Sequence, residues 1–436
     1  MNDPSGQKGG LSRRSLLARA GGLALAAGGA AGAAGCENTT TPVAVAGAGG
    51  GGKGILGDPT AGGPVDASGI PLARRDYRVT LPRIGDAVKS GAKPERGGEL
   101  RIYNYADYLN PAVLKQFGKQ EGVEVKVTTF DTLDEAFSKL SAGQLKFDVI
   151  FSSPDQLSRL VGRRLIQPLN FELIPNLVAN AWPELHDPFY DRGPRYSVPY
   201  TVYTTGIGWR NDHVNFDPSK LDNPWEEFWK ADQYRGRVGI LDDVREALGM
   251  ALMRRGVADI NTEKPELLEQ ATKDLQDLDK RVRVKVTISQ YETLPAGRMW
   301  LHQAWSGDLI SAVISYLPKG TPPTVLSYWF QPTGGPIFND CICVATNAEK
   351  PVIAHRFLNY LLDNDAAYEN FVDYVGYQPP ITAIDADKLF NDEILPPNLR
   401  NTVVSHEDYA NGNAYLTLSS DGQRLWDRSW ATFRNG

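Results

Sequence analysis

The sequence is poor in the two residue types that most often build disulfide frameworks and metal sites. It contains 3 cysteines and 5 histidines among its 436 residues. Three cysteines are too few for a disulfide framework, and Cys341 and Cys343 lie two apart in one predicted strand, which favours buried free thiols. The histidines show no metal-ligand spacing. We therefore expect neither a bound metal nor another cofactor.

The sequence also lacks recognisable catalytic motifs. It contains no nucleophile elbow and no zinc-protease signature, and after Arg96 it has neither internal repeats nor long low-complexity tracts. We therefore expect a binding protein rather than an enzyme. The enzymatic alternative is a secreted glycosidase that uses Asp243 or Glu246 with Asp340 as its acid and base pair.

Positive charge is in short supply in the part of the chain that we expect to fold. The whole chain has 46 Lys and Arg against 52 Asp and Glu, and 12 of these basic residues but only 7 of the acidic ones precede residue 97. The remaining 340 or so residues therefore carry a formal charge of about −11. This excess disfavours nucleic acids and anionic partners and suits a cationic ligand. The length exceeds one comfortable hydrophobic core and favours two lobes.

Residues 1–36 have the pattern of an export signal. The segment Ser12–Leu17 contains the adjacent arginines of a twin-arginine signal, followed by an Ala/Gly-rich, weakly hydrophobic run. A transmembrane helix is the alternative, but the run contains Arg19 and few large aliphatic residues. Ala33–Cys36 resembles a lipoprotein processing box, which makes Cys36 the predicted lipidation site. We expect an exported protein on the outer side of the cytoplasmic membrane, held there by a lipid anchor.

Residues 37–96 connect this signal to the folded part. Residues 37–69 are mainly Thr, Gly, Ala and Pro, a composition that cannot bury enough apolar surface to fold, and we expect a flexible tether. Residues 70–96 contain three spaced prolines and an excess of basic residues, which predicts an extended lead-in on the domain surface.

The folded part begins with a predicted β-α-β unit. Alternating apolar residues predict strands at 100–104 and 123–130, and Pro111 begins the helix that joins them. The loop after the first strand contains Tyr105 and Tyr108. Ligands of open parallel sheets bind at such strand ends, so these tyrosines are candidate binding residues.

Further strands and helices alternate along the chain and predict an α/β fold with mixed or parallel sheets. The other predicted strands are 147–151, 206–209, 238–241, 282–288 and 342–345. The other predicted helices are 133–140, 247–253, 267–278 and 352–362.

Three acids lie at predicted element ends. Asp243 and Glu246 follow the strand 238–241 and open a helix, where their spacing is also that of a helix-capping pair. Asp340 comes at the start of the strand 341–345, where a strand-mouth position gives access to a cleft. The alternative for Asp340 is a turn aspartate that binds local amides.

Aromatic residues accompany these acids. Trp305 ends an apolar run just before a predicted helix, Tyr377 lies next to a turn, and Phe338 is close to Asp340. Core packing explains Trp305 equally well, and Tyr377 fits an exposed position equally well. Together the set suits an organic cation, because carboxylates offset the lost hydration of ammonium groups and aromatic walls cover methylenes, with about 0.5–2 kcal/mol per good cation-π contact.

The chain resembles the spermidine/putrescine-binding proteins of ABC importers over residues 97–380. The segments that carry the resemblance, in order, are Tyr103–Pro111, Phe147–Ser153, Ser197–Tyr200 with Thr205–Gly208, Leu241–Ala247, Ala304–Gly307, Gly334–Asp340 and Val375–Tyr377. This resemblance implies a two-lobed, type II periplasmic-binding-protein-like α/β fold with the ligand between the lobes. It also implies a monomer whose closed form is recognised by a membrane permease with its ATPase subunits.

The expected lobes are discontinuous in sequence. Lobe one is expected to hold residues 97–199 and 338–384, and lobe two residues 200–337 and 385–436. The chain would then cross between the lobes more than once.

The resemblance also assigns site residues. Asp243, Glu246 and Asp340 match the carboxylates that hold polyamine nitrogens, and Trp305 matches an aromatic that lines the aliphatic chain. The further matching positions are Tyr105, Tyr108, Ser153 and Tyr377. A polar contact from the C-terminal region is expected from Asp408 or Tyr409.

The chain departs from this pattern at three positions. Tyr105 and Phe338 stand where the family has tryptophan, and Asp155 stands where a tyrosine is usual. The aromatic box is therefore expected to be smaller and to include an additional acid. We expect a linear polyamine, with spermidine slightly ahead of putrescine, because three separated acids suit more than one nitrogen. The alternative is another organic cation or small solute.

Overall fold

The computed structural model describes residues 80–436 except for residues 131, 144–145 and 194. The predicted export signal, Cys36 and the tether therefore lie outside the described residues. Within the described part, no helix is both long enough and apolar enough to cross a membrane.

The first described elements form the predicted β-α-β unit. Strand β1 (Glu99–Tyr105) is joined to the parallel strand β2 (Glu124–Phe130) by helix α2 (Pro111–Glu121). The side chain of Asn110 caps α2 by accepting the backbone N–H of Ala112 at 2.9 Å, with a proline at the first helical position. The predicted β-α-β unit is confirmed.

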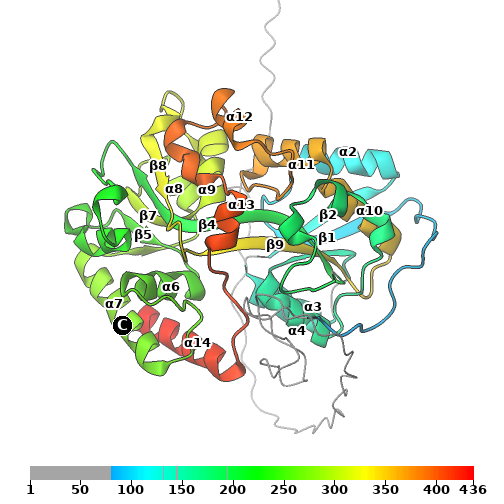
Figure 1. Ribbon diagram of the computed structural model, residues 1–436, viewed down its shortest axis with the longest axis horizontal. Helices are drawn as coiled ribbons and strands as arrows, with labels where there is room; N and C mark the ends of the chain where they lie inside the picture. The colour runs from blue at the N-terminus through cyan, green and yellow to red at the C-terminus, as the bar shows by residue number, and fades with distance from the viewer. Residues whose placement is uncertain (1–79, 131, 144–145, 194) are drawn as a thin grey trace, which may run out of the picture. The chain divides into compact units, whose positions relative to one another are not determined.

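Nine strands form one mixed sheet (Figure 1). Its order is β2-β1-β3-β9-β4-β7-β5-β6, and β8 also pairs with β4. The remaining strands are β3 (Val149–Ser152), β4 (Ser197–Arg210), β5 (Val238–Ile240), β6 (Lys285–Val286), β7 (Leu301–Trp305), β8 (Leu326–Trp329) and β9 (Ile337–Val344). The long strand β4 pairs with β9 in its first part and with β7 and β8 in its last part, so it runs through both halves of the sheet.

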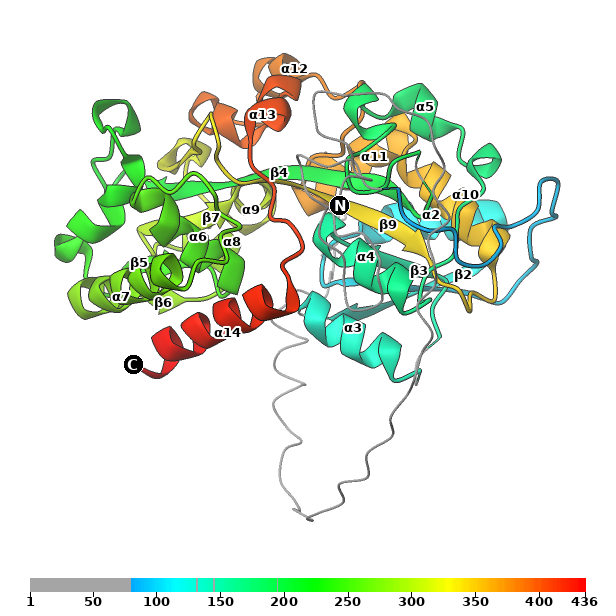
Figure 2. The same ribbon diagram turned by 60° about the horizontal axis from the view of Figure 1, so that its bottom comes forward.

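The helices cover both faces of the sheet (Figures 1 and 2). The longer ones are α3 (Leu133–Ser141), α4 (Pro154–Gly162), α6 (Val244–Arg254), α7 (Pro265–Val282), α10 (Pro351–Leu361) and α14 (Ser420–Asn435). The shorter ones are α5 (Asn176–Asn180), α8 (Gln290–Thr293), α9 (Ser306–Ser311), α11 (Asn364–Asn370), α12 (Ala386–Asn391) and α13 (His406–Asn411). A 3-10 segment, η1 (Phe171–Leu173), and a π-helical segment, η8 (Phe371–Val375), also border the regions discussed below.

Separate hydrophobic cores form in the two halves of the sheet. In the half with β1, β3 and β9, one face packs on α2 and α10, and the other packs on α3 and α4. In the other half, β5 and β7 pack with α6, α7 and α14 around Trp225 and Trp426. Residues 412–419, here called the C-terminal strap, descend between the two halves from α13 to α14 (Figure 1).

Three sequence predictions need correction. The strand predicted at 206–209 is only the end of β4, whose first part also pairs with β9. The strand predicted at 282–288 shrinks to β6, because α7 continues through Val282 and ends at Arg283, which has a left-handed backbone with φ of 52°. Asp340 does not begin a strand but lies inside β9. Both described cysteines are buried free thiols, as predicted.

Candidate functional site

One face of the sheet forms the floor of the candidate site where β4 passes from one half to the other. Side chains alternate between the faces of a strand, so Thr201, Tyr203 and Thr205 of β4 point the same way. Their cross-strand partners on this face are, in order, Asp340, Phe338 and Trp305. The row from position 201 to position 205 spans about 13 Å along β4. Acids and aromatics predicted from distant segments are therefore neighbours on one surface.

Asp340 lies at one end of this row, beside the end of β3. The last residue of β3, Ser152, is opposite Cys341, so the side chain of Asp340 faces the end of β3. Asp340 is 5% exposed. The hydroxyl of Tyr108 donates to its Oδ2 at 2.8 Å, and the hydroxyl of Tyr203 donates to its Oδ1 at 3.3 Å. Asp340 therefore lies next to the C-terminal end of β3.

The partners of Asp340 are neutral, and its ionisation reflects this. Burial raises the pKa of Asp340 to about 7, because its carboxylate loses hydration. The hydroxyl groups of Tyr108 and Tyr203 partly oppose this rise in pKa, and the carboxylate of Asp155 adds to it. A cation bound here would favour the ionised form.

Asp243 and Glu246 have different roles, although their spacing suggested a capping pair. Asp243 caps α6, and its Oδ1 accepts the backbone N–H of Arg245 at 2.8 Å and that of Glu246 at 3.0 Å. The Glu246 side chain turns instead to the sheet, where Oε1 accepts the hydroxyl of Thr205 at 2.8 Å and the indole N–H of Trp305 at 2.7 Å. Capping therefore explains Asp243 but not the carboxylate of Glu246.

Glu246 marks the other end of the row and is 4% exposed. Burial and, to a lesser extent, the nearby carboxylate of Asp243 raise its pKa to about 8. Three donors, on Trp305, Thr205 and Tyr415, lower this pKa. As at Asp340, the hydrogen-bond donors to the carboxylate are neutral, so the site has a buried acid at each end.

Aromatic rings connect the two ends. Tyr203 stacks on Phe338 with ring centroids 5.2 Å apart, and Phe338 packs against Tyr415 at 5.1 Å. Tyr377 meets Tyr108 edge-on at 5.1 Å and Tyr203 edge-on at 5.2 Å. Such rings provide the flat apolar walls that methylene groups require.

Ser153 and Asp155 lie where β3 leads into α4. The hydroxyl of Ser153 donates to the carboxylate of Asp155, and the amide of Gln156 donates to the same carboxylate at 2.7 Å. Tyr105 packs edge-on against Tyr108 at 5.7 Å. Burial raises the pKa of Tyr105 well above its ordinary value, and Asp340, Asp155 and Asp243 add to the rise, in that order. Tyr105 therefore lies in the combined field of three acids.

The site has an excess of negative charge. Within the described part of the chain, no ion pair is formed by the four acids Asp155, Asp243, Glu246 and Asp340. Arg245 is the neighbouring cation and lowers the pKa of Asp243, but its guanidinium donates to Leu416 and Asn261 and lies over the ring of Trp426. Among the described residues, no three acidic, His or Cys side chains are close enough together to hold a metal ion. This arrangement fits an extended organic cation better than a bare metal ion.

A model of the bacterial extracellular solute-binding proteins matches residues 112–397, about two thirds of the chain. The chain belongs to this family. Its proteins bind solutes, so the family relation supports binding in place of the glycosidase alternative.

Named relatives are similar over most of their length. The spermidine/putrescine-binding periplasmic protein of Escherichia coli (strain K12) is 28% identical over 306 residues, which are 70% of this chain and 83% of that protein. The putrescine-binding periplasmic protein SpuD of Pseudomonas aeruginosa is 25% identical over 371 residues, 81% of this chain and 96% of that protein.

The fold matches solved structures of the same class. The substrate-binding protein PotD of a spermidine/putrescine ABC transporter from Streptococcus pneumoniae gives a TM-score of 0.62 at 23% identity, over 78% of this chain and 99% of that one. The expected two-lobed type II α/β fold of this solute-binding protein is confirmed.

Sequence reasoning missed several residues of the candidate site. Tyr203 and Thr205 hold Asp340 and Glu246, and their alternation would have revealed them had β4 been recognised at its full length. Tyr415, on the C-terminal strap, donates to Glu246 at 3.4 Å. Asp408 and Tyr409 were the expected C-terminal contacts, but Asp408 caps α13 and Tyr409 donates to Asn339, whose side chain points to the opposite face of β9 from Asp340.

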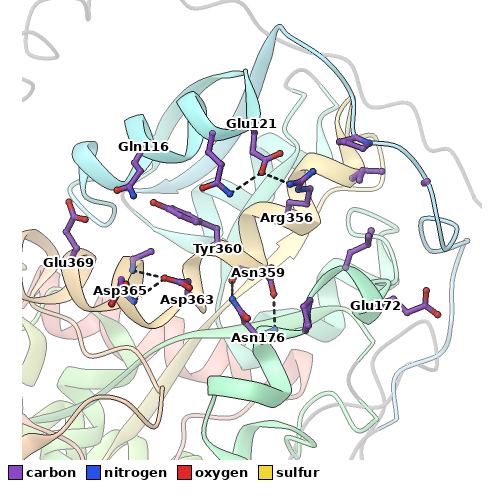
Figure 3. Close-up of a pocket in the computed structure, with 17 residues that line it drawn as sticks. Gln116, Glu121, Glu172, Asn176, Arg356, Asn359, Tyr360, Asp363, Asp365 and Glu369 are labelled. Atoms are coloured by element: carbon purple, nitrogen blue, oxygen red, sulfur yellow. Dashed lines mark hydrogen bonds and ion pairs between the residues drawn. The ribbon is translucent and has the colours of Figure 1, made fainter.

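A second hollow lies away from this site, on the outer side of α2, α10 and α11 (Figure 3). It has a volume of about 560 Å³ and is bordered by the acids Glu121, Glu172, Asp363, Asp365 and Glu369. Arg356 pairs with Glu121 at 2.9 Å, and Asp363 caps α11. The hollow is larger than a single ammonium requires, but its acids are paired, capping or open to water. The row of buried acids and aromatics is therefore the better candidate for the solute site.

Proposed function

We propose that this protein is the substrate-binding component of an ABC importer, and that it captures a linear polyamine and delivers it to a membrane permease with its ATPase subunits. It acts outside the cytoplasmic membrane as a monomer. Spermidine is the first candidate ligand and putrescine the second. The ligand-binding residues are the ten predicted from the sequence. Tyr203, Thr205 and Tyr415 are added because they donate hydrogen bonds to the acids.

The observation that carries the proposal is the pair of buried acids joined by aromatic rings. Glu246 and Asp340 are 4% and 5% exposed and accept hydrogen bonds from neutral groups. Burying two carboxylates without a counter-ion is costly, and an amine with a nitrogen at each end supplies the missing charges. The names of the relatives, which include spermidine and putrescine, point to the same ligand class.

Calorimetric titration of the exported domain tests the ligand class. We expect binding of spermidine and putrescine, and no heat from glycine, glutamate or simple sugars at the same concentrations. An amino acid would bring a carboxylate into a site that already has an excess of acids. A response to another solute class with none to any polyamine would refute the ligand assignment and leave the fold and family in place.

We also propose that the protein is held at the membrane through lipid on Cys36. The residue lies outside the described part of the structure, and the proposal is based on the sequence around it and on the composition of the tether. A single lipid chain gives only marginal attachment, so stable anchoring requires the multiply acylated form. Cys36→Ala should release the protein from washed membranes. Equal fractionation of the variant and the parent with membranes would contradict the anchor.

A further inference from the structure

Asp155 lies between the end of β3 and the C-terminal strap. On one side it follows β3 by three residues, and the end of β3 at Ser152 is opposite Cys341, the neighbour of Asp340. On the other side, the hydroxyl of Thr417 donates to the backbone carbonyl of Asp155 at 2.7 Å. The residue before Thr417 is bound by Arg245, which neighbours Glu246.

The carboxylate of Asp155 has donors but no cation. Ser153 and Gln156, both from its own segment, donate to it, and these short local bonds orient the group. It forms no ion pair with any described residue. The side chain is partly buried, so solvent only partly compensates for its charge.

The electrostatic field of Asp155 reaches both ends of the site. It raises the pKa of Asp340 and that of Asp243, and it also raises the pKa of Tyr105 between them. Coulomb effects of this kind require proximity, because the interaction falls with distance and with screening. Asp155 is therefore close enough to affect both Asp340 and Asp243, the residue that caps the helix of Glu246.

Three acidic positions suit a ligand with three nitrogens better than a ligand with two. A diamine that satisfies the two ends leaves Asp155 without a counter-ion, whereas an internal secondary ammonium supplies one. The floor row of about 13 Å along the backbone of β4 is also longer than the roughly 6 Å between the two nitrogens of a four-carbon diamine.

We propose that Asp155 is a specificity-determining residue that binds the internal nitrogen of the ligand, so that the site selects a linear triamine over a diamine of equal length. This inference rests on the proposed polyamine-binding function. Size alone does not separate the two amines, because an internal methylene and an internal ammonium occupy similar space between aromatic walls.

The test compares spermidine with 1,8-diaminooctane, which has the same number of atoms between its terminal nitrogens but lacks the internal one. Calorimetric dissociation constants are measured for both amines with the parent protein and with Asp155→Asn, which removes the charge and keeps the size. We expect the parent to prefer spermidine by about tenfold or more, and Asp155→Asn to reduce this ratio to within about threefold. The loss should come from weaker spermidine binding, with the affinity for the diamine unchanged or improved.

Glu172→Gln, in the outer hollow, is the matched control for loss of one negative charge, and it should leave both constants and their ratio unchanged. Equal binding of the two amines by the parent, or an unchanged ratio in Asp155→Asn, would overturn the role of Asp155 while leaving the polyamine function in place. Failure of both amines to bind the parent would instead refute the proposed function itself. Thermal unfolding of Asp155→Asn without ligand shows whether the variant is folded. If it is not, Asp155→Ser replaces it in the titrations, after circular dichroism has shown that this second variant is folded.

Discussion

The buried candidate site and the outer hollow are both rich in acids, yet they differ in how the charges of those acids are compensated. In the outer hollow Glu121 is paired with Arg356, and Asp363 accepts the backbone N–H groups that begin α11 (Figure 3). In the inner site Asp340 and Glu246 are buried against hydroxyl and indole donors. The number of acids is therefore a poor guide to a cation site, and the absence of a fixed counter-ion is a better one.

The same difference explains why volume does not identify the site. An open hollow lets water solvate its carboxylates, so a cation gains little by replacing that water. A buried carboxylate without a cation is held in a disfavoured state, and a ligand that pairs with it recovers free energy. The inner acids therefore lower the stability of the ligand-free protein and favour ligand binding, whereas the outer acids affect stability without affecting binding.

Removal of an inner acid should have the largest effect. Asp340→Asn and Glu246→Gln each leave an ammonium without its counter-ion, and we expect spermidine affinity to fall by about 2–5 kcal/mol in calorimetric titrations. Without ligand, both variants should unfold at the parent's temperature or above it at pH 8, because a neutral amide replaces a buried acid.

Asp191 provides a buried control for these variants. Its Oδ2 accepts the backbone N–H groups of Arg195, Tyr196 and Ser197, so Asp191 stabilises a turn. We expect it to take no part in ligand binding. Asp191→Asn should lower the unfolding temperature and leave affinity unchanged. If Asp340→Asn behaves like Asp191→Asn, the contrast between binding acids and structural acids is wrong.

Displacement of Tyr415 should have the next largest effect. Gly249 of α6 leaves space for the Tyr415 hydroxyl, and a methyl group at position 249 would overlap it. Gly249→Ala should therefore move Tyr415 away from Glu246 and Phe338, with a cost of about 1–3 kcal/mol. Weaker spermidine binding, by about tenfold, should accompany this cost. Tyr415→Phe removes only the hydroxyl and should weaken binding less; an equal or stronger loss would show that the ring position is not what Gly249 protects.

The pH dependence should separate the two regions further. The folded pKa values of about 7 for Asp340 and about 8 for Glu246 lie above those of exposed acids. The folded protein therefore binds more protons than the unfolded chain between about pH 4 and pH 8, and the stability of the ligand-free protein falls as pH rises through this window. Aliphatic ammonium groups stay protonated to about pH 10, so ligand affinity should rise over the same window.

Two measurements check this dependence. Spermidine affinity should increase by about a hundredfold or more from pH 6 to pH 8, because both acids must lose a proton. Titrations in buffers with different ionisation enthalpies should show protons released on binding near pH 7, and fewer of them in Glu246→Gln. No proton release on binding, or an affinity that does not change with pH, would mean that these acids are already ionised without ligand.

The smallest effects are expected in the outer hollow. Arg356→Ala removes the partner of Glu121, whose side chain is 5% exposed, and should cost about 1 kcal/mol of stability because the arginine itself is half exposed. Ligand affinity should not change. A clear loss of spermidine binding in Arg356→Ala, measured on protein that remains folded, would show that the two regions are coupled.

Much of the architecture could be predicted from local patterns. The β-α-β unit of residues 99–130 follows from alternation, the Asn110 cap and Pro111, all of which act within a few residues. Predictions were wrong where a neighbour far away in sequence decides the outcome. The strand at 282–288 shrank because α7 continues to Val282, and Asp340 proved to be internal because β4 extends the pairing of β9 to Ile337.

The sequence by itself determined which chemical groups are available: carboxylates and aromatic rings at element ends, and no metal-binding or catalytic motif. Only the tertiary structure decided which of these groups lack counter-charges and which share a surface. Asp243 and Glu246 have the same capping spacing, yet one binds the backbone of its helix and the other reaches Thr205 and Trp305. The physical reason is that hydration and pairing depend on what lies around a carboxylate, and here those neighbours come from strands about 40 and 60 residues away in the chain.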